Sequence, residues 1–319
     1  MTAAFLDFAT VGSDELDISS LQSVAPGLRV FDNTAPEDAA SRIAGCEFVF
    51  VNKVRITREI IEAGDALRFI GLLATGVDNV DLDAARANNV AVCNIRGYCT
   101  NSVVEHVFAV LLQLTHSISL YNRSVRAGEW QRATNFCMLG FPLRELSAMT
   151  LGIVGYGELG GNVAKTAGAF GMQVKVARRI GQKPIAGDGR VDLDELLRDC
   201  DAISLHCPLN DDTRGLIAER ELRLMKSSAI LINTARGGLV DSAALVSALS
   251  NGTIAAAAID VLPQEPPVNG DPLLDYAGDN LILTPHIAWA SVEARQNAID
   301  EVAKNVRSFL QGGNRNRVV

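Results

Sequence analysis

The sequence predicts an α/β protein built from two doubly wound parallel sheets, each with helices on both faces. Two series of short apolar segments alternate with helical patterns, one before Thr150 and one from Thr150 onward, and such alternation is typical of parallel sheets. The length of 319 residues also favours two domains, because single hydrophobic cores stop growing at roughly 250–300 residues. A hydrophobic share of 48% and a charged share of 21% are those of a globular protein.

The first series is expected to form one complete sheet. Its expected strands are Ala4–Phe8, Leu28–Phe31, Glu47–Val51, Leu67–Leu72 and Val90–Val92, and helices are expected at Ala35–Ala44 and Thr57–Ala63. The strand segments are short and almost wholly apolar, as strands covered on both faces are.

One long helix is expected between the two series, over Asn101–Ala127. Apolar residues such as Val104, Val107 and Leu111 recur there at helical spacing, and no Gly or Pro occurs before Gly128. A helix in this place would connect two domains.

The second series supplies the other sheet. Its expected strands are Thr150–Val154, Gln173–Ala177, Ala202–His206, Ala229–Asn233, Ile254–Asp260 and Leu281–Leu283. A final helix over Ser291–Leu310 could return to the first domain. The second domain would then be inserted into the first, and the chain would cross between them twice, which makes a natural hinge.

Composition excludes several classes of partner. The net charge of -8 and the pI near 5.1 argue against nucleic acid and against an anionic membrane surface. No apolar run reaches the roughly 20 residues of a membrane span, and the N-terminus lacks the basic start of a signal peptide.

The six cysteines lack CxxC spacing and are expected to be buried free thiols, so a reducing, cytoplasmic location is predicted. No His/Asp/Glu set has metal-ligand spacing, so no metal is expected.

A glycine pattern, Gly155-x-Gly157-x-x-Gly160, lies between an expected strand and an expected helix. In a dinucleotide-binding turn the first glycine permits the tight turn, the second lets the backbone approach the pyrophosphate, and the third lets helix and strand pack closely. The pyrophosphate would lie at the N-terminus of the helix, where N–H groups and the helix dipole favour negative charge. The alternative is a structural βα turn without a ligand.

Two arginines stand where this fingerprint has an acidic residue for the adenosine ribose. Arg178 and Arg179 follow the second strand of the motif. A guanidinium pairs bidentately with a 2′-phosphate, and the missing carboxylate would have repelled that phosphate. NADP(H) is therefore the predicted cofactor. The alternative is that both arginines are solvated and NAD(H) is used.

Three polar residues follow strands of the second series: Arg236, Glu265 and His286. Open αβ sheets bind ligands at these carboxyl ends. When a hydride adds to a keto carbon the oxygen needs a proton, and an imidazole donates one near neutral pH. Glu265 would keep His286 charged and oriented, while Arg236 would bind a substrate carboxylate and polarise the keto oxygen. Singly, each residue also has an ordinary structural explanation.

The chain resembles the D-isomer-specific 2-hydroxyacid dehydrogenase family over essentially its whole length. The resemblance is carried by Gly76–Asp81, the GYGELG turn, His206–Asn210, Asn233–Gly238, Asp260–Val261 through Glu265–Pro266, and Thr284–His286. It implies a Rossmann dinucleotide domain, residues 100–287, inserted into a flavodoxin-like substrate domain, residues 1–99 plus 288–319. It also implies that Arg236, Glu265 and His286 are the catalytic set, with His286 as acid/base.

The resemblance further implies the residues that bind substrate and cofactor. The implied substrate-binding residues are Ala74, Thr75, Gly76, Val77, Arg236 and His286, and Trp289 is a candidate wall of the pocket or a packing residue. The implied cofactor-binding residues are Val104, Gly155, Tyr156, Gly157, Glu158, Leu159, Arg178, Arg179, His206, Cys207, Pro208, Thr213, Thr234, Ala235, Arg236, Asp260, His286 and Ala288. A homodimer built on the long helix is implied as well.

Within that family, His286–Ser291 and Val51–Lys53 look like the glycerate dehydrogenases, also called hydroxypyruvate reductases. The expected activity is therefore reduction of hydroxypyruvate or glyoxylate to the D-2-hydroxy acid. Two alternatives stay open. One is another substrate of the family, such as the keto form of D-lactate, phosphoglycerate or a branched 2-hydroxy acid. The other is a dinucleotide-sensing binding protein that resembles a corepressor.

Overall fold

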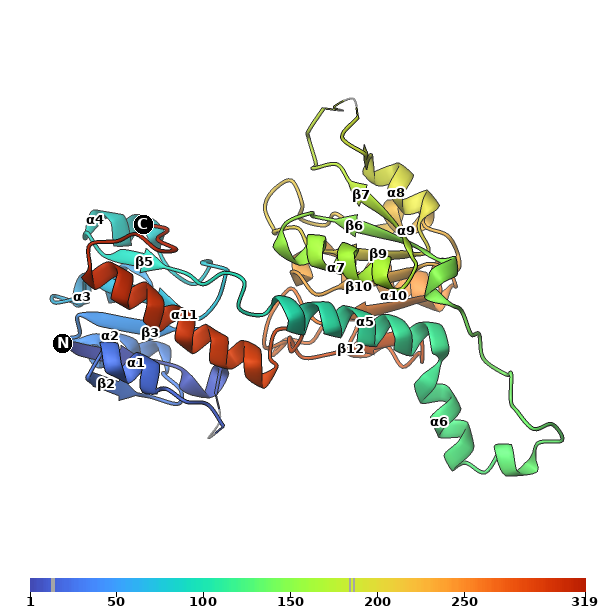
Figure 1. Ribbon diagram of the computed structural model, residues 1–319, viewed down its shortest axis with the longest axis horizontal. Coiled ribbons are helices and arrows are strands. Elements are labelled where there is room, and N and C mark those ends of the chain that lie inside the picture. The colour runs from blue at the N-terminus through green and yellow to red at the C-terminus, as the bar shows by residue number, and fades with distance from the viewer. Residues whose placement is uncertain (13–14, 184, 186) are drawn as a thin grey trace. The chain divides into compact units, whose positions relative to one another are not determined.

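The computed structural model describes residues 1–12, 15–183, 185 and 187–319. The chain falls into two compact units, here called unit 1 and unit 2. Unit 1 comprises Met1–Cys99 with Trp289–Val319, and unit 2 comprises Thr100–Ala288. Each unit contains one fully parallel sheet with helices (Figure 1), so the predicted fold class is confirmed.

Unit 1 has a five-stranded sheet with the order β2-β1-β3-β4-β5, which is the flavodoxin-like order. Its strands are β1 (Thr2–Phe5), β2 (Gly27–Val30), β3 (Phe48–Val51), β4 (Phe69–Leu72) and β5 (Ala91–Cys93). Its helices are α1 (Ser19–Val24), α2 (Ala39–Ile43), α3 (Arg58–Ala63), α4 (Leu82–Ala87) and α11 (Val292–Leu310), with 3₁₀ turns η1 (Phe8–Thr10) and η2 (Pro36–Asp38).

The first expected strand, Ala4–Phe8, was wrong at its end. The strand stops at Phe5 because Asp7, only 2% exposed, turns its carboxylate to the loop after β3. That carboxylate accepts hydrogen bonds from the backbone N–H groups of Asn52 (2.9 Å), Lys53 (2.5 Å) and Val54 (2.9 Å). Phe8 then begins the 3₁₀ turn η1.

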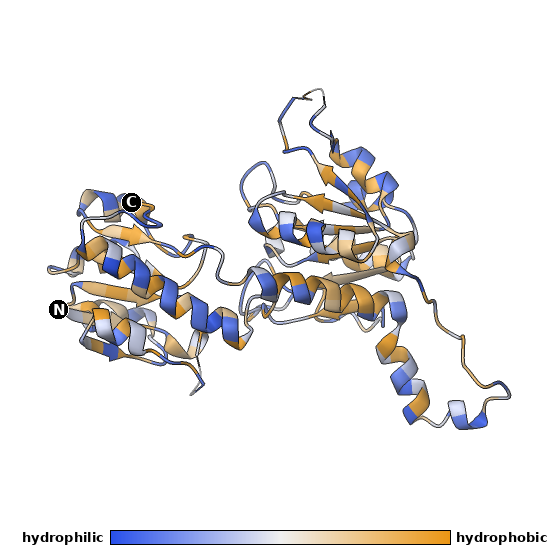
Figure 2. Cartoon of the chain, viewed as in Figure 1, coloured by the Kyte–Doolittle hydropathy of each residue, from blue (hydrophilic) through white to orange (hydrophobic). Residues whose placement is uncertain are grey.

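Helix α11 packs on the sheet of unit 1, so the final helix does return to the first domain. Phe309 lies against Phe48 and Phe69, with ring centroids 6.0 Å and 5.2 Å away. Val302 and Val306 on the same helix are fully buried. Figure 2 shows the alternation along α11 between hydrophobic and hydrophilic residues, beside strands that are mostly hydrophobic.

Unit 2 has a seven-stranded parallel sheet with the order β12-β11-β10-β9-β6-β7-β8, which extends the Rossmann order by one strand. Its strands are β6 (Thr150–Val154), β7 (Gln173–Ala177), β8 (Arg190–Val191), β9 (Ala202–Leu205), β10 (Ile230–Asn233), β11 (Ala256–Ile259) and β12 (Leu281–Leu283). Its helices are α5 (Thr100–His116), α6 (Ile118–Arg126), α7 (Glu158–Ala169), α8 (Leu193–Asp199), α9 (Glu219–Leu224) and α10 (Ser242–Ser250), with 3₁₀ turns η3 (Trp130–Arg132), η4 (Leu146–Ala148) and η5 (Gly237–Leu239).

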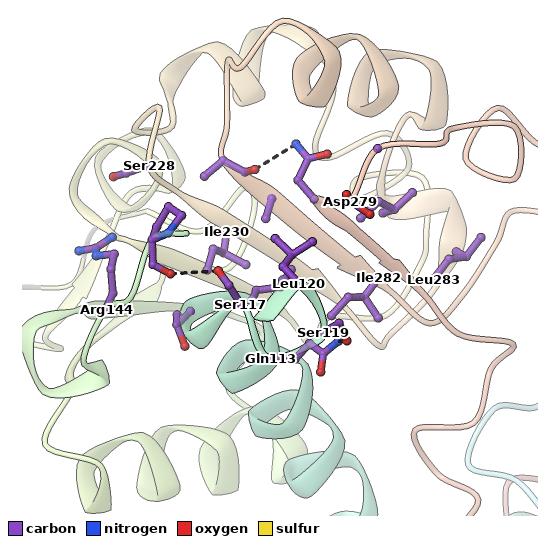
Figure 3. A pocket seen from close by; sticks show the side chains of 18 of the residues that line it. Gln113, Ser117, Ser119, Leu120, Arg144, Ser228, Ile230, Asp279, Ile282 and Leu283 are labelled. Carbon is purple, nitrogen blue, oxygen red and sulfur yellow. Dashed lines mark hydrogen bonds between the residues drawn. The ribbon is translucent and has the colours of Figure 1, made fainter. Parts of the chain in front are cut away.

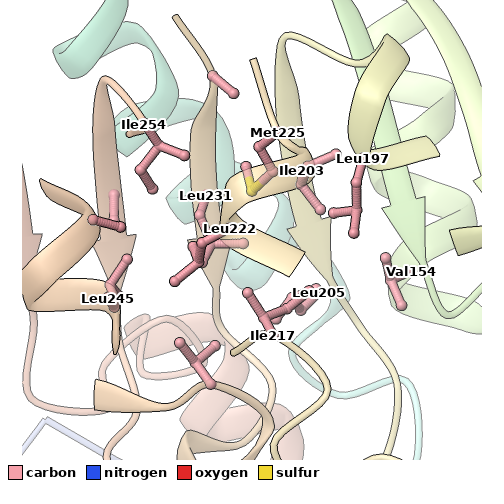
Figure 4. Packing of buried hydrophobic residues seen from close by; sticks show 14 of the residues in the cluster. Val154, Leu197, Ile203, Leu205, Ile217, Leu222, Met225, Leu231, Leu245 and Ile254 are labelled. Atoms are coloured by element: carbon pink, nitrogen blue, oxygen red, sulfur yellow. The ribbon is translucent and has the colours of Figure 1, made fainter. Parts of the chain in front are cut away.

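The core of unit 2 fills the space between the sheet and its helices. Ile203, Leu205 and Leu231 from central strands meet Leu222 and Leu245 from α9 and α10 (Figure 4). On α5, buried Val104, Val107 and Leu111 lie on the side of Phe108, whose ring stacks on Phe170 at 5.1 Å.

The single helix expected over Asn101–Ala127 is two helices. Helix α5 ends at His116, Ser117 has a left-handed backbone with φ 50°, and α6 follows at a bend of 55°. The break is fixed by the returning chain. Arg144 N–H donates to the carbonyl of Thr115 (3.0 Å), and Ser117 Oγ donates to the carbonyl of Pro142 (2.9 Å). These bonds take up polar groups at the end of α5, where the helix would otherwise continue.

No single described helix is long and apolar enough to cross a membrane, although α5 and α6 taken together as a bent pair meet that test of length and composition. All six cysteines are free thiols, and burial raises the pKa of Cys93 to about 11 and that of Cys200 to about 12. The cytoplasmic location stays a prediction from the sequence.

Candidate active site

The glycine turn after β6 has the close contacts that its pattern predicts. Gly155 has φ 96°, and a Cβ there would lie 2.5 Å from the backbone nitrogen of Cys207. A Cβ on Gly160 would lie 2.0 Å from the carbonyl oxygen of Gly155. Both glycines are therefore required by backbone packing, the first also by its left-handed conformation.

Gly157 differs from these two, because a Cβ there would have no atom within 4 Å. It is the N-cap of α7 and makes no side-chain cap, so the N–H groups of the first turn lie beside open space. The carboxylate of Glu158 is held aside by a hydrogen bond from Thr100 Oγ1 (2.5 Å). Space and N–H donors together fit the pyrophosphate of a dinucleotide.

The two arginines after β7 are in different environments. The Arg178 side chain is 10% exposed, is ion-paired with Asp192, and donates from Nη2 to the carbonyl of Arg190 (2.9 Å). Arg179 is exposed, and its side chain makes no hydrogen bond or ion pair with another described residue. Arg178 therefore already has partners in this structure, whereas Arg179 is available to a ligand.

Further predicted contact residues lie after β6, β9 and β10 and elsewhere in unit 2. Tyr156 is 49% exposed beside the guanidinium of Arg190. Thr213 is 6% exposed, and its hydroxyl donates to the carbonyl of Pro208 (2.7 Å), so its side chain closes its own loop. Thr234 Oγ1 is buried without a hydrogen-bond partner among the described residues, and such an atom suits a contact with a bound cofactor. Val104 and Ala288 are buried in unit 2.

His206 is half-buried as a residue, and its ring has few hydrogen-bond partners. Its Nε2 lies 2.8 Å from Ser204 Oγ, and its Nδ1 is buried with no partner among the described residues. Burial lowers the pKa of the His206 ring to about 4. The ring is therefore neutral near pH 7, in contrast to the role expected of an acid/base.

Arg236 stands on a rigid turn after β10. The fully buried Asn233 at the end of the strand donates to the carbonyl of Arg236 (2.9 Å) and accepts from Ala235 N–H (3.0 Å). A Cβ on Gly237 would lie 2.0 Å from the carbonyl carbon of Leu262, so the turn is packed directly against the loop after β11. That loop carries Glu265. The turn that carries Arg236 and the loop that carries Glu265 are therefore in backbone contact.

His286 and Glu265 form the pair that was predicted from the sequence. His286 Nδ1 lies 2.6 Å from Glu265 Oε2, with the two side chains 26% and 35% exposed. The other carboxylate oxygen of Glu265 accepts from Leu262 N–H (2.9 Å). A carboxylate so anchored fixes the imidazole by one nitrogen and leaves Nε2 for proton transfer.

Asp260 fixes the loop that carries His286. Its buried carboxylate accepts from Thr284 Oγ1 (2.6 Å), Ile287 N–H (2.9 Å) and Ala288 N–H (2.9 Å). His286 N–H donates to the Asp260 carbonyl (2.7 Å), and His286 has φ 57°. Sequence reasoning named Asp260 as a cofactor contact but missed this role, and it missed Asn233. The available signal was a polar residue closing each apolar strand.

The candidate substrate loop Ala74–Val77 follows β4 in unit 1. The N–H groups of Thr75, Gly76 and Val77 donate to no other described residue. Trp289 packs on Tyr98 in the same unit, with ring centroids 6.3 Å apart. Unpaired backbone N–H groups in a loop are suited to an anion such as a carboxylate.

A cavity of about 540 Å³ lies elsewhere in unit 2, at the junction of α5 and α6 (Figure 3). Ser117, Leu120, Arg144, Ile230 and Ile282 are among the residues that line it. Ile230 and Leu281 begin their strands, so the cavity lies at the amino ends of the sheet. None of the predicted site residues lines it.

Among the described residues, no group of three or more His, Cys, Asp or Glu is placed to hold a metal ion.

Comparisons with known proteins agree on one family. The family model described as D-isomer specific 2-hydroxyacid dehydrogenase, NAD binding domain, matches residues 108–288. The chain is 45% identical over 283 residues to a glycerate dehydrogenase of Methylorubrum extorquens, covering 89% of this chain and 88% of that protein. It is 36% identical over 317 residues to a hydroxypyruvate reductase of Blautia hydrogenotrophica, covering 98% of each.

Among solved structures, the acyclic imino acid reductase Bsp5 in complex with NADPH and D-Arg is similar over 100% of both chains. The TM-score is 0.86 and the sequence identity 30%. The family model covers more than half of this chain, and the relatives are matched over nearly their whole length. The chain therefore belongs to the D-isomer-specific 2-hydroxyacid dehydrogenase family and is an oxidoreductase of that family.

Proposed function

We propose that this protein reduces a small 2-keto acid, hydroxypyruvate or glyoxylate, to the D-2-hydroxy acid, with NADPH as the preferred reductant. The observation that carries the proposal is the 2.6 Å pair of His286 and Glu265 at the carboxyl edge of a dinucleotide-binding sheet. A bound nicotinamide would supply the hydride. The chain itself must then bind the acid, hold the keto group and deliver one proton.

In this proposal His286 is the acid. Its Nε2–H gives a proton to the keto oxygen as the carbon gains a hydride, so the C=O double bond becomes C–H and O–H. Glu265 on Nδ1 stabilises the charged ring before transfer and fixes the direction of Nε2. Arg236 would bind the carboxylate and polarise the keto oxygen. In unit 1, the N–H groups of Thr75, Gly76 and Val77 are proposed to bind the substrate carboxylate.

The preference for NADPH is proposed from Arg179 first and Arg178 second. Arg179 is exposed and carries the charge needed for a 2′-phosphate, while Arg178 is held by Asp192 and Arg190. The relative with NADPH bound supports the choice, and the family model named for NAD keeps NAD(H) as the alternative.

Hydroxypyruvate is the first candidate substrate, because two close relatives are named glycerate dehydrogenase and hydroxypyruvate reductase.

Residues 1–99 with 288–319 are proposed as the substrate domain and residues 100–287 as the NADP-binding domain. Trp289 is proposed to wall the substrate pocket beside its packing on Tyr98.

A homodimer is proposed as well, on the second half of the Asn101–Ala127 segment that the sequence indicated and on the residues that follow it. The apolar face of α5 is buried inside unit 2. The exposed apolar side chains lie on α6 and the segment after it, and include Val125 (46%), Phe136 (90%), Leu139 (77%) and Leu143 (51%). Figure 1 shows this segment extending from the rest of its unit. A second copy of the chain is the proposed cover.

The test is a steady-state panel of hydroxypyruvate, glyoxylate, pyruvate and 2-ketoisocaproate, each with NADPH and with NADH. We expect the highest kcat/KM for hydroxypyruvate or glyoxylate with NADPH. A best substrate among the larger keto acids would favour the other dehydrogenases. Cofactor binding without oxidation by any keto acid would favour the dinucleotide-sensing alternative and contradict the proposal.

A further inference from the structure

The loop Ala74–Val77 is held by hydrogen bonds to its carbonyl groups. Fixing a carbonyl also fixes the direction of the N–H in the same peptide unit. Ile95 N–H donates to the carbonyl of Ala74 (3.1 Å), and Asn94 Nδ2 donates to the carbonyl of Thr75 (2.7 Å). A trans peptide unit is planar, so its C=O and N–H point in opposite directions. The N–H groups of Thr75 and Gly76 belong to these two units. They therefore point away from Ile95 and Asn94.

Asn94 is itself held by a hydrogen bond from helix α11. Its backbone carbonyl accepts from Nδ2 of Asn305 (2.8 Å), a fully buried residue of α11. The Oδ1 atom of Asn305 accepts from Nδ2 of Asn316 (3.1 Å). Three asparagine side chains thus donate in one direction, from the segment after α11 toward the loop after β4.

The segment Asn316–Val319 is fixed by backbone pairing with β5. Val318 N–H donates to the Val92 carbonyl (2.7 Å), Asn94 N–H donates to the Asn316 carbonyl (3.2 Å), and Cys93 and Arg317 form an antiparallel bridge. The series of three asparagine donors therefore begins on a segment that is anchored to β5.

Ordinary packing does not account for Asn94. The residue is 6% exposed, and its Oδ1 atom is buried without a hydrogen-bond partner among the described residues. An unpaired buried acceptor destabilises the folded state, and an apolar side chain of similar size would avoid that cost. What only an amide supplies at this position is the donor to the Thr75 carbonyl.

We propose that Asn94 is a positioning residue for the substrate carboxylate, and that Asn305 and Asn316 position Asn94. By holding the Thr75 carbonyl, Asn94 aims the Gly76 N–H at the carboxylate of the bound acid. The inference rests on the proposed function, since it assigns the loop Ala74–Val77 to the carboxylate.

The first test is Asn94→Asp, which keeps the size of the side chain but replaces the donor with an acceptor that repels the Thr75 carbonyl. We expect KM for the 2-keto acid to rise about tenfold, with kcat within about threefold and the Kd for NADPH unchanged, since a charge-assisted hydrogen bond is lost. Asn88→Asp, at an exposed position, is the control for the same chemical change. The Asn88 amide also donates to a backbone carbonyl of unit 1, that of Ala84 (2.9 Å), but away from the loop.

Asn316→Asp is the second test, because Asn316 is only half-buried and its left-handed backbone (φ 50°) tolerates Asp. We expect a smaller rise in KM, about threefold, with kcat unchanged. An equal fall in Tm with KM unchanged in both variants would overturn the inference and leave a purely structural network. Wild-type protein that reduces no 2-keto acid with either cofactor would instead contradict the proposed function.

Discussion

Arg178 and Arg179 show how much one residue's environment changes an expectation from sequence. The sequence placed both beside the adenosine ribose, and the structure separates them by their partners. Arg178 is held by Asp192 and the Arg190 carbonyl, while Arg179 is exposed. Sequence alone does not distinguish them, because the carboxylate that engages Arg178 comes from beyond β8.

The cofactor prediction at this scale compares Arg179→Ala with Arg178→Ala. We expect Arg179→Ala to raise the Kd for NADPH by about tenfold or more and to leave the Kd for NADH unchanged, because a phosphate–guanidinium pair is lost. Arg178→Ala is expected to weaken both cofactors less and to lower Tm, since it frees Asp192. Fluorescence titration measures both constants. Equal loss of NADPH and NADH affinity in Arg179→Ala would refute the assignment, and Arg198→Ala on α8 is the control.

His206 gives a prediction of pH dependence. Burial lowers the pKa of its ring to about 4 from an ordinary 6.5, so the folded protein favours the neutral ring. The unfolded chain takes up this proton near pH 6.5, and the free energy of unfolding therefore falls as the pH drops from 6.5 toward 4. The loss is about 3 kcal/mol at most.

Denaturant unfolding at several pH values measures this loss. In His206→Gln the contribution should disappear over that range, whereas His116→Gln, at an exposed position, should follow the wild type. An unchanged pH dependence in His206→Gln would show that the ring is charged or solvated in the folded protein.

At the scale of the elements, the sequence predicted strands better than helix ends. The strands β6 and β7 were placed at their observed bounds, and β6 has the mainly apolar, buried sequence of a strand covered on both faces. The break at Ser117 was missed. No Gly or Pro marks it, and it depends on hydrogen bonds with Arg144 and Pro142, far along the chain: Arg144 N–H donates to Thr115, and the Pro142 carbonyl accepts from Ser117.

The turn between β6 and α7 makes a prediction about an element. In Gly160→Ala the new Cβ would lie 2.0 Å from the Gly155 carbonyl oxygen, so α7 must move away from the turn. We expect the Kd for NADPH to rise by about tenfold or more, because the N–H groups at the N-terminus of α7 move with the helix. Gly161→Ala is the matched control, since a Cβ there has no atom within 4 Å, and Ala should stabilise the helix by up to about 1 kcal/mol. Equal Kd values for the two variants would contradict this account.

The segment after α6 makes a prediction about assembly. Its turn is held internally by the Trp130 indole, which donates to the Phe136 carbonyl (2.9 Å), yet Phe136 itself is 90% exposed. We expect the wild type to be a dimer by light scattering, and the double variant Phe136→Ser with Leu139→Ser to be a monomer. Leu274→Ser, at another exposed apolar residue, should remain a dimer. A dimer of unchanged stability in the double variant would exclude this surface.

For the whole molecule, the alternation of strands and helices was enough to predict two parallel sheets. The alternation alone does not give the strand order, because that order depends on which face each crossover helix takes; the flavodoxin-like and Rossmann orders were implied by the family resemblance. At the candidate site, Arg236, Glu265 and His286 could be named from the sequence because each follows an apolar strand. The support from Asn233 and Asp260 was not, because their bonds depend on turn geometry that no spacing in the sequence shows.

His286, held by Glu265, is proposed to deliver the proton that completes keto-acid reduction. Single-turnover reduction of hydroxypyruvate by enzyme preloaded with NADPH tests it most directly, in the wild type and in His286→Ala, with the Kd for NADPH measured in parallel. We predict that the rate falls by about a hundredfold to ten-thousandfold while the Kd changes by less than about twofold. A His286→Ala enzyme that turns over near the wild-type rate would contradict the account.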